Sequence, residues 1–191
     1  IDMGREQLDL LIRIGAFRFT GLNKYELMWE KNAVYSPMVK HNGTGFLFDS
    51  EKEDYKLPVL EEGPHDQAFD EIELLGFPLS DPFELLTSSF RGSVVASELM
   101  DRLGRKVTML GYFITRKYVR TVHGKLMNFG TFIDTNGHFF DTVHFPISLG
   151  KYPFKGGGCY AIEGKVVEEF GFPSIEVSRM EKLPYVKDER Y

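Results

Sequence analysis

The chain has 191 residues, of which 42% are hydrophobic and 14% aromatic, and its formal net charge is -5. This length and composition are typical of a globular protein with one or two domains. The single cysteine, Cys159, excludes an internal disulfide and any zinc site built from several cysteines. No apolar run is long enough to span a membrane, and no signal peptide is recognisable, so we expect a cytoplasmic protein that does not bind a membrane.

Two short helices are predicted within residues 1–30. An apolar stripe at helical spacing is formed by Leu8, Leu11 and Ile12. Gly15 follows as a natural left-handed cap. Asn23 and Glu26 have the spacing of a capping box at the start of the second helix. Two helices about a glycine-containing turn predict a helical hairpin.

Residues 31–68 are rich in Asn, Gly, Ser, Pro and acids, which predicts an acidic linker. Within it lies a short apolar island, Thr44-Gly45-Phe46-Leu47-Phe48. An exposed island of this kind is typical of a docking peptide, because burial of apolar side chains in a partner favours binding. The alternative is that Phe46 and Phe48 pack against this protein's own surface.

Residues 69–103 predict short connecting helices. One is expected from Phe69 to Leu75, with Gly76 ending it. Asp81 has the position of a cap for the next helix, because Pro82 follows in the first turn. A last helical segment is expected over residues 97–103.

Residues 104–191 predict a small β-barrel. Strands are expected at Arg105–Arg120, Leu126–Asp134, His138–Phe145, Cys159–Glu169 and Ser174–Met180. Gly111, in the middle of the long first strand, would let that strand coil sharply and serve two sheets. Five strands with the longest connector between the third and fourth are the plan of an OB-fold, which binds mostly oligonucleotides or oligosaccharides. The predicted fold class is therefore α+β, with small helical N-terminal segments followed by a five-stranded OB-fold barrel.

Cations and one aromatic ring alternate along the first hairpin of this barrel, which favours binding to nucleic acid. In the third strand, alternation predicts Phe139, Val143 and Phe145 in the core. The opposite, binding face would then carry Phe140 and His144. The nucleic-acid-binding residues predicted in this way are Arg116, Lys117, Tyr118, Arg120, His123, Lys125, Phe140 and His144.

Three alternatives remain open at the level of sequence. The cations could be an ordinary solvated rim of the barrel. Phe140 could be buried beneath the connector between the third and fourth strands. In the second strand, either Phe129 or Phe132 could face outward.

No catalytic site is predicted. The five histidines show no spacing typical of metal ligands. Asp134 and Asp141 lie on neighbouring strands, but carboxylates in such positions are usually solvated or hydrogen-bonded locally. The run Lys155-Gly156-Gly157-Gly158 lacks the strand and helix that flank a phosphate-binding loop. We therefore expect no metal and no cofactor in this chain.

Three islands of sequence occur in the same order as in a known family. They are Leu11-Ile12-Arg13-Ile14-Gly15-Ala16-Phe17, then Leu75-Gly76-Phe77-Pro78-Leu79-Ser80-Asp81-Pro82, then the barrel segments 104–111, 123–134 and 141–146. Together they resemble the C-terminal part of the bacterial replicative DNA polymerase III alpha subunit, from its helix-hairpin-helix region to its OB domain. The second island is one residue shorter than the family's Leu-Gly-Phe-Tyr-Leu-Ser-x-His-Pro signature, and Pro78 and Asp81 depart from it.

The resemblance implies a noncatalytic C-terminal fragment of that polymerase. Its barrel would bind or guide single-stranded template DNA, and its helical hairpin would contact duplex DNA or brace helices outside this sequence. The aspartates that hold Mg²⁺ for nucleotidyl transfer lie upstream in the family, so this chain is expected to be inactive alone. The family's sliding-clamp-binding peptide resembles Gln-x-x-Leu-Phe; Leu47 and Phe48 match its anchors, and Thr44 stands where the Gln would be.

Two other functions fit an OB-fold barrel. It could be a protein-interaction module that binds another replisome subunit, in which case the rim cations would be incidental. It could also be an RNA-binding domain, which would prefer RNA over DNA.

Overall fold

The computed structural model describes residues 3–34 and 61–190. These residues form two compact units. One unit is Leu79–Lys187, and the other contains the described residues up to Pro78 together with Asp188 to Arg190. Residues 79–103, which the sequence predicted as separate connecting helices, belong to the same unit as the barrel.

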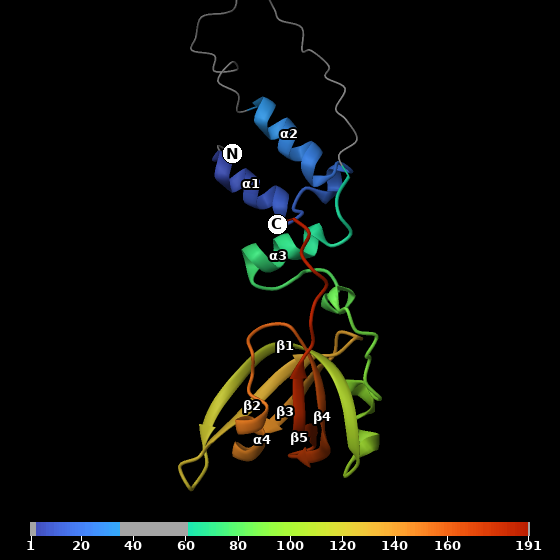
Figure 1. Cartoon of the computed structure of the whole chain (residues 1–191), viewed down its shortest axis with the longest axis vertical. Helices are drawn as coiled ribbons and strands as arrows, with labels where there is room; N and C mark the ends of the chain where they lie inside the picture. Colours follow the sequence, from blue (N-terminus) through green and yellow to red (C-terminus); the bar gives the residue numbers. More distant parts are fainter. Residues whose placement is uncertain (1–2, 35–60, 191) are drawn as a thin grey trace, which may run out of the picture. The chain divides into compact units, whose positions relative to one another are not determined.

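Five strands close into a barrel in the order β1-β2-β3-β5-β4 (Figure 1). They are β1 (Lys106–Arg120), β2 (Leu126–Ile133), β3 (Phe139–His144), β4 (Cys159–Glu169) and β5 (Phe172–Lys182). Neighbouring strands are antiparallel except β3 and β5, which run parallel. The short helix α4 (Pro146–Lys151) lies between β3 and β4. This order and this connector are those of an OB-fold, so the predicted fold class is confirmed.

Strand β1 takes part in both halves of the barrel. Its residues 106–112 pair with β4, and residues 112–120 pair with β2. Gly111 lies where the pairing changes. A Cβ atom built on Gly111 would lie 2.6 Å from Cζ of Phe140 and 3.0 Å from Cβ of Phe132. The strand can therefore coil here only because this residue has no side chain.

The barrel core is apolar and rich in aromatic rings. Its buried members include Val107, Met109, Phe132, Phe140, Tyr160, Ile162, Val166, Ile175, Val177 and Met180. The rings of Phe132 and Phe140 stack with centroids 5.6 Å apart. Each such buried side chain stabilises the fold by about 1.5–3 kcal/mol. Because Phe132 lies inside, the outward aromatic residue of β2 is Phe129.

The structure reverses the predicted faces of β3. Phe140 and His144 point into the barrel and are buried, whereas Phe139 and Phe145 are 65% and 43% exposed. The predictions that Phe140 and His144 face a ligand, and that Phe139 and Phe145 lie in the core, are therefore wrong. Val143 is buried as predicted, although it belongs to the outward set.

Glycines on the neighbouring strands explain this reversal. Gly111 leaves room for the Phe140 ring. Gly130 of β2 pairs with Thr142 of β3, and a Cβ atom on Gly130 would lie 2.8 Å from the Thr142 hydroxyl oxygen. Space inside the barrel is therefore available for the set that contains Phe140, Thr142 and His144.

The segment before the barrel forms short 3-10 turns. Asp81 caps Pro82–Leu85, because its carboxylate accepts a 2.8 Å hydrogen bond from the backbone N–H of Phe83. The helix predicted at residues 97–103 is two such turns, Ala96–Glu98 and Met100–Arg102. Asp134 accepts a hydrogen bond of 2.8 Å from the backbone N–H of Ala96 and bonds its own turn as well, which matches the local role predicted for it.

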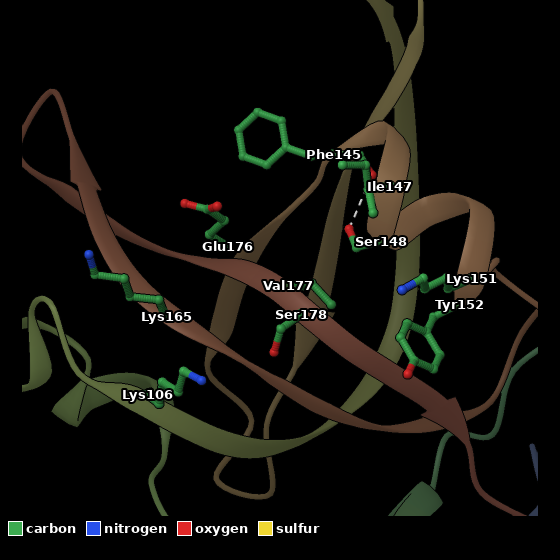
Figure 2. Close-up of a pocket in the computed structure, with 10 residues that line it drawn as sticks. All are labelled: Lys106, Phe145, Ile147, Ser148, Lys151, Tyr152, Lys165, Glu176, Val177 and Ser178. Carbon is green, nitrogen blue, oxygen red and sulfur yellow. Dashed lines mark hydrogen bonds between the residues drawn. The ribbon is translucent and has the colours of Figure 1, made fainter.

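A pocket of about 450 Å³ opens between α4 and β5 (Figure 2). The pairing of β3 with β5 ends at Val143 and Glu176, and the pocket begins immediately beyond this point, at Phe145 and Val177. The other lining residues are Lys106, Ile147, Ser148, Lys151, Tyr152, Lys165, Glu176 and Ser178.

The other unit is built from α1 (Arg5–Arg13), α2 (Lys24–Val34) and α3 (Asp66–Leu75). The predicted capping box is present: the Asn23 side chain accepts from the Glu26 N–H at 2.9 Å, and the Glu26 carboxylate accepts from the Asn23 N–H at 2.8 Å. Helix α3 begins at Asp66, three residues before the predicted start at Phe69, and ends at the left-handed Gly76 as predicted.

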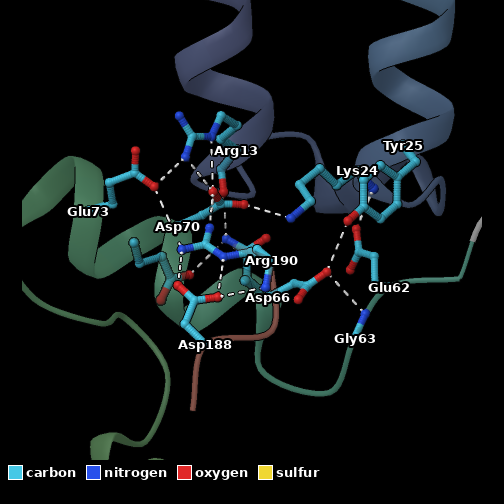
Figure 3. Close-up of polar contacts among 12 residues, drawn as sticks. Arg13, Lys24, Tyr25, Glu62, Gly63, Asp66, Asp70, Glu73, Asp188 and Arg190 are labelled. Atoms are coloured by element: carbon cyan, nitrogen blue, oxygen red, sulfur yellow. Dashed lines mark hydrogen bonds and ion pairs between the residues drawn. The ribbon is translucent and has the colours of Figure 1, made fainter.

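A buried carboxylate, that of Asp70, holds this helical unit together (Figure 3). It forms ion pairs with Arg13 at 2.6 Å, Lys24 at 2.6 Å and Arg190 at 2.5 Å. Burial alone would raise the pKa of Asp70, but hydrogen bonds from Lys24 and Arg13 outweigh burial and lower the pKa below its usual value.

A second buried carboxylate lies beside Asp70. Glu71 forms an ion pair with Arg18 of the same unit at 2.7 Å. Asp70 and Glu71 therefore stabilise the fold, and their charges are balanced by paired cations.

Replacing Gly111 with alanine is predicted to destabilise the barrel. The added methyl group would overlap the Phe140 ring, and overpacking of this kind lowers the free energy of unfolding by about 1–3 kcal/mol. Urea unfolding followed by circular dichroism measures the change. Gly150→Ala, in α4, is the control, because its added methyl meets no atom within 4 Å. Equal stabilities of the two variants would contradict the role given to Gly111.

Replacing Asp70 with asparagine is predicted to destabilise the helical unit by about 3–5 kcal/mol, because buried cations lose their partner. A carboxylate whose folded pKa lies below its unfolded pKa contributes stability above about pH 4, and that contribution is lost as the pH falls through the folded value. Asp70→Asn should therefore remove this part of the acid sensitivity. Fluorescence of Trp29, the only tryptophan and part of α2, reports on this unit. Asp101→Asn is the exposed control, and an unchanged acid profile in Asp70→Asn would contradict the assignment.

Candidate nucleic-acid interface

Strand register defines the outer face of the barrel. Residues directly opposite each other on paired strands point to the same side of the sheet. One row of outward residues runs Lys117–Phe129–Val143, and the next runs Thr115–Thr131–Asp141. A third row pairs Ile133 with Phe139. The outer faces of β2 and β3 thus carry Phe129 and Phe139, and β1 adds Lys117 beside Phe129.

Strand β5 adds a third phenylalanine to this surface. Ser174 pairs with Asp141 in parallel register, and Phe172 lies two residues before Ser174, so it points outward as well. The exposed fractions are 36% for Phe129, 65% for Phe139 and 76% for Phe172. Exposed aromatic residues from neighbouring strands of one face are typical of a binding surface. We call Phe129, Phe139, Phe172 and Lys117 the aromatic face.

The turn between β4 and β5 carries one further aromatic side chain. Phe170 has a positive φ of 54°, uncommon for a residue other than glycine, and its side chain is 99% exposed. Gly171 follows with a φ of 83°. The sequence analysis predicted only that one strand ends at Glu169 and the next begins at Ser174. The signal that could have revealed more is the pair Phe170 and Phe172 around a turn glycine, where polar residues are usual.

The predicted cations of the first hairpin do not share one face. Lys117 lies opposite Phe129, on the aromatic face. Arg116 lies opposite Gly130, so it points to the other side, and its guanidinium group lies over the rings of Tyr118 at 4.8 Å and Phe154 at 5.3 Å. Such cation–π contacts hold Arg116 in place. The structure therefore brings Lys117 to the aromatic face and separates Arg116 and Tyr118 from it.

The remaining cations lie at the end of the same hairpin. Arg120 alternates with Arg116 and Tyr118, so it belongs to their side of β1. His123 and Lys125 are exposed in the turn that joins β1 to β2. They are accessible to a ligand but do not belong to the aromatic face.

His144 is an internal group. Thr142 donates its hydroxyl proton to the carbonyl oxygen of Gly130, so Nε2 of His144 must donate in its 2.9 Å contact with that hydroxyl oxygen. Nδ1 is buried and makes no hydrogen bond within the described part of the chain. Burial lowers the pKa of His144 to about 4. The ring is therefore neutral at physiological pH and offers no charge to a phosphate.

Acidic groups border the aromatic face. Asp141 lies between the rows of Phe129 and Phe139, and it accepts a 2.7 Å hydrogen bond from the hydroxyl of Thr131. Glu169 pairs with Phe172. Because cations and acids are mixed here, the ring surfaces, rather than a strong positive field, are the main means of holding a ligand.

The remaining predictions concern metals, membranes and the docking peptide. Residues 3–34 and 61–190 contain no cluster of three His, Cys, Asp or Glu side chains that could hold a metal ion. No helix within these ranges is long and apolar enough to cross a membrane. The predicted clamp-binding residues Thr44, Leu47 and Phe48 lie outside the described residues.

No family model and no curated protein matches the chain. It is similar to the solved single-stranded DNA binding protein from Thermus aquaticus, with 14% identity and a TM-score of 0.38, over 44% of this chain and 42% of that one. An OBody bound to hen egg-white lysozyme has 14% identity and a TM-score of 0.38, over 52% and 99%. The second OB-fold domain of replication protein A from Methanococcus maripaludis has 12% identity and a TM-score of 0.32, over 45% and 91%. Identities and TM-scores as low as these carry no argument about function, so the function of the barrel must be argued from its own geometry.

The buried His144 is predicted to make the barrel sensitive to mild acid. The unfolded chain binds a proton near pH 6.5 and the folded chain only near pH 4, so stability falls as the pH drops between these values, by up to about 3 kcal/mol. His144→Gln should remove this slope. Urea unfolding at pH 7 and pH 5, followed by circular dichroism, measures it. The exposed His138→Gln is the control; a slope that survives in His144→Gln would show that another group causes it.

Proposed function

We propose that the barrel binds single-stranded DNA across the aromatic face. The observation that carries this proposal is that three phenylalanines on adjoining strands are exposed on one face, with Lys117 directly opposite Phe129. Bases stack on such rings whatever their sequence, and a cation beside them can contact the phosphate backbone. The faces of β2 and β3, bordered by the β1–β2 and β4–β5 turns, form the surface on which OB-folds bind oligonucleotides.

The wider role we propose is that of a noncatalytic C-terminal piece of a bacterial replicative polymerase alpha subunit. The support for it is the resemblance of three ordered sequence islands, at residues 11–17, at residues 75–82 and in the barrel segments 104–111, 123–134 and 141–146. In that setting the barrel would guide the template single strand. The segment containing Leu47 and Phe48 would dock the sliding clamp.

A second candidate is a protein-interaction module, and the composition of the aromatic face favours it. Asp141 and Glu169 lie beside the phenylalanines, and acids repel a phosphate backbone. Exposed aromatic residues such as Phe170 are also typical anchors of protein interfaces. DNA binding separates the two candidates, since a protein-interaction module need not bind DNA at low salt.

The test is fluorescence anisotropy of a labelled fifteen-residue oligothymidylate with the full chain and its variants. Phe139→Ala should weaken binding about tenfold, because one stacked base contributes about 1–3 kcal/mol. Phe77→Ala removes a ring that is exposed outside the barrel and should leave binding unchanged. Lys117→Gln should reduce the salt dependence by about one phosphate contact.

Three outcomes would contradict the proposal. They are no binding at about 50 mM salt, equal affinities of Phe139→Ala and the unmodified chain, and a loss of binding in Phe77→Ala as large as in Phe139→Ala. A parallel titration with oligouridylate decides between DNA and RNA, because an RNA-binding barrel would bind the ribose-containing strand more tightly.

A further inference from the structure

The pocket beside α4 is lined by lysines from three different elements. Lys106 belongs to β1, Lys165 to β4 and Lys151 to α4. None of them forms an ion pair with another described residue. In Figure 2, Lys106 and Lys151 extend toward Val177 and Ser178 from opposite sides. The pocket is therefore a hollow with unpaired positive charge on several sides.

Two of these lysines repel each other. Lys106 and Lys165 lie directly opposite on the paired strands β1 and β4, where like charges are destabilising. Glu176 lies opposite Lys165 on its other side and offsets part of this repulsion. The three groups still leave one net positive charge, and Lys151 adds a second from across the pocket. An anion bound between the lysines would relieve the repulsion.

The other walls determine which anion fits. Ser148 and Ser178 donate their hydroxyl protons to backbone carbonyl oxygens of Phe145 and Glu163, both at 3.1 Å, so neither has a proton left for a ligand. The side-chain donors that remain for a ligand are therefore the ammonium groups and the hydroxyl of Tyr152. Ile147 and Phe145 give the pocket an exposed apolar side. A pocket with cationic donors and an apolar side suits an anion attached to a flat, less polar group.

We propose that this pocket binds a phosphate group of a nucleotide, with Lys106, Lys151 and Lys165 holding the phosphate and the apolar side accommodating the rest of the molecule. The phosphate could come from a free mononucleotide or from the backbone of a strand. The second source is geometrically reasonable, because the outward row Lys117–Phe129–Val143 continues through Glu176 to Lys165 around the barrel. The site lies outside the aromatic face and does not require it.

The test is isothermal titration of the full chain with inorganic pyrophosphate at low salt. Pyrophosphate should bind the unmodified chain, and the double variant Lys106→Gln with Lys165→Gln should bind it about four- to twenty-five-fold more weakly, since each charge removed costs about two- to fivefold. Lys187→Gln, an exposed lysine outside the pocket, should bind normally. Without ligand, the double variant should melt no lower than the unmodified chain, because it loses the repulsion between like charges.

Competition identifies the source of the phosphate. Displacement of pyrophosphate by deoxyadenosine monophosphate alone indicates a free nucleotide, and displacement by oligothymidylate indicates a strand. The proposal is overturned if pyrophosphate does not bind, if the double variant binds it equally well, or if neither competitor displaces it. Binding of pyrophosphate in a chain whose Phe139→Ala variant binds DNA normally would reject the aromatic face and retain the pocket.

Discussion

The contact between the Phe140 ring and the backbone of Gly111 is the constraint on which the barrel depends. It lets β1 coil from its pairing with β4 into its pairing with β2. It also fixes which side of β3 faces inward, since the space above Gly111 is filled by Phe140. Because side chains alternate, Phe139 must then face outward. The same contact that closes the barrel thus creates the exposed surface to which we assign binding.

Some charged side chains of this protein are paired inside the fold, and others remain unpaired at the surface. The net charge of -5 argues at first sight against a nucleic-acid ligand. However, one of the acids that make up this charge, Asp70, is paired inside the helical unit with Arg13, Lys24 and Arg190. It therefore contributes little to the electrostatic potential at the surface. On the barrel, the lysines of the α4 pocket have no such partners. Local pairing therefore decides where an anion can bind, and the overall charge does not.

The sequence was sufficient to predict the architecture, because its signals are local. Gly111 and the long connector between the third and fourth strands indicated the five-stranded barrel, and Asn23 with Glu26 indicated the start of α2. The faces of β3 could not be predicted, since four of its six residues are apolar, aromatic or histidine, so that either alternation would place apolar side chains in the core. The inward face is determined by the space inside the barrel, which Gly111 and Gly130 on the neighbouring strands leave for Phe140 and Thr142.

The binding site was also predicted only in part, because it depends on residues that different strands bring together. Arg116 and Lys117 are adjacent on one strand and therefore point to opposite sides, but only the register with β2 shows that Lys117 is the one beside Phe129. The lysine pocket joins residues 106, 151 and 165, which no local pattern connects. Binding of DNA to the aromatic face is tested most directly by photo-crosslinking of the full chain to an oligodeoxynucleotide that carries 5-iodouracil. We predict adducts at Phe139 and Phe172. Adducts confined to the helical unit, or none on β2, β3 and β5, would contradict it.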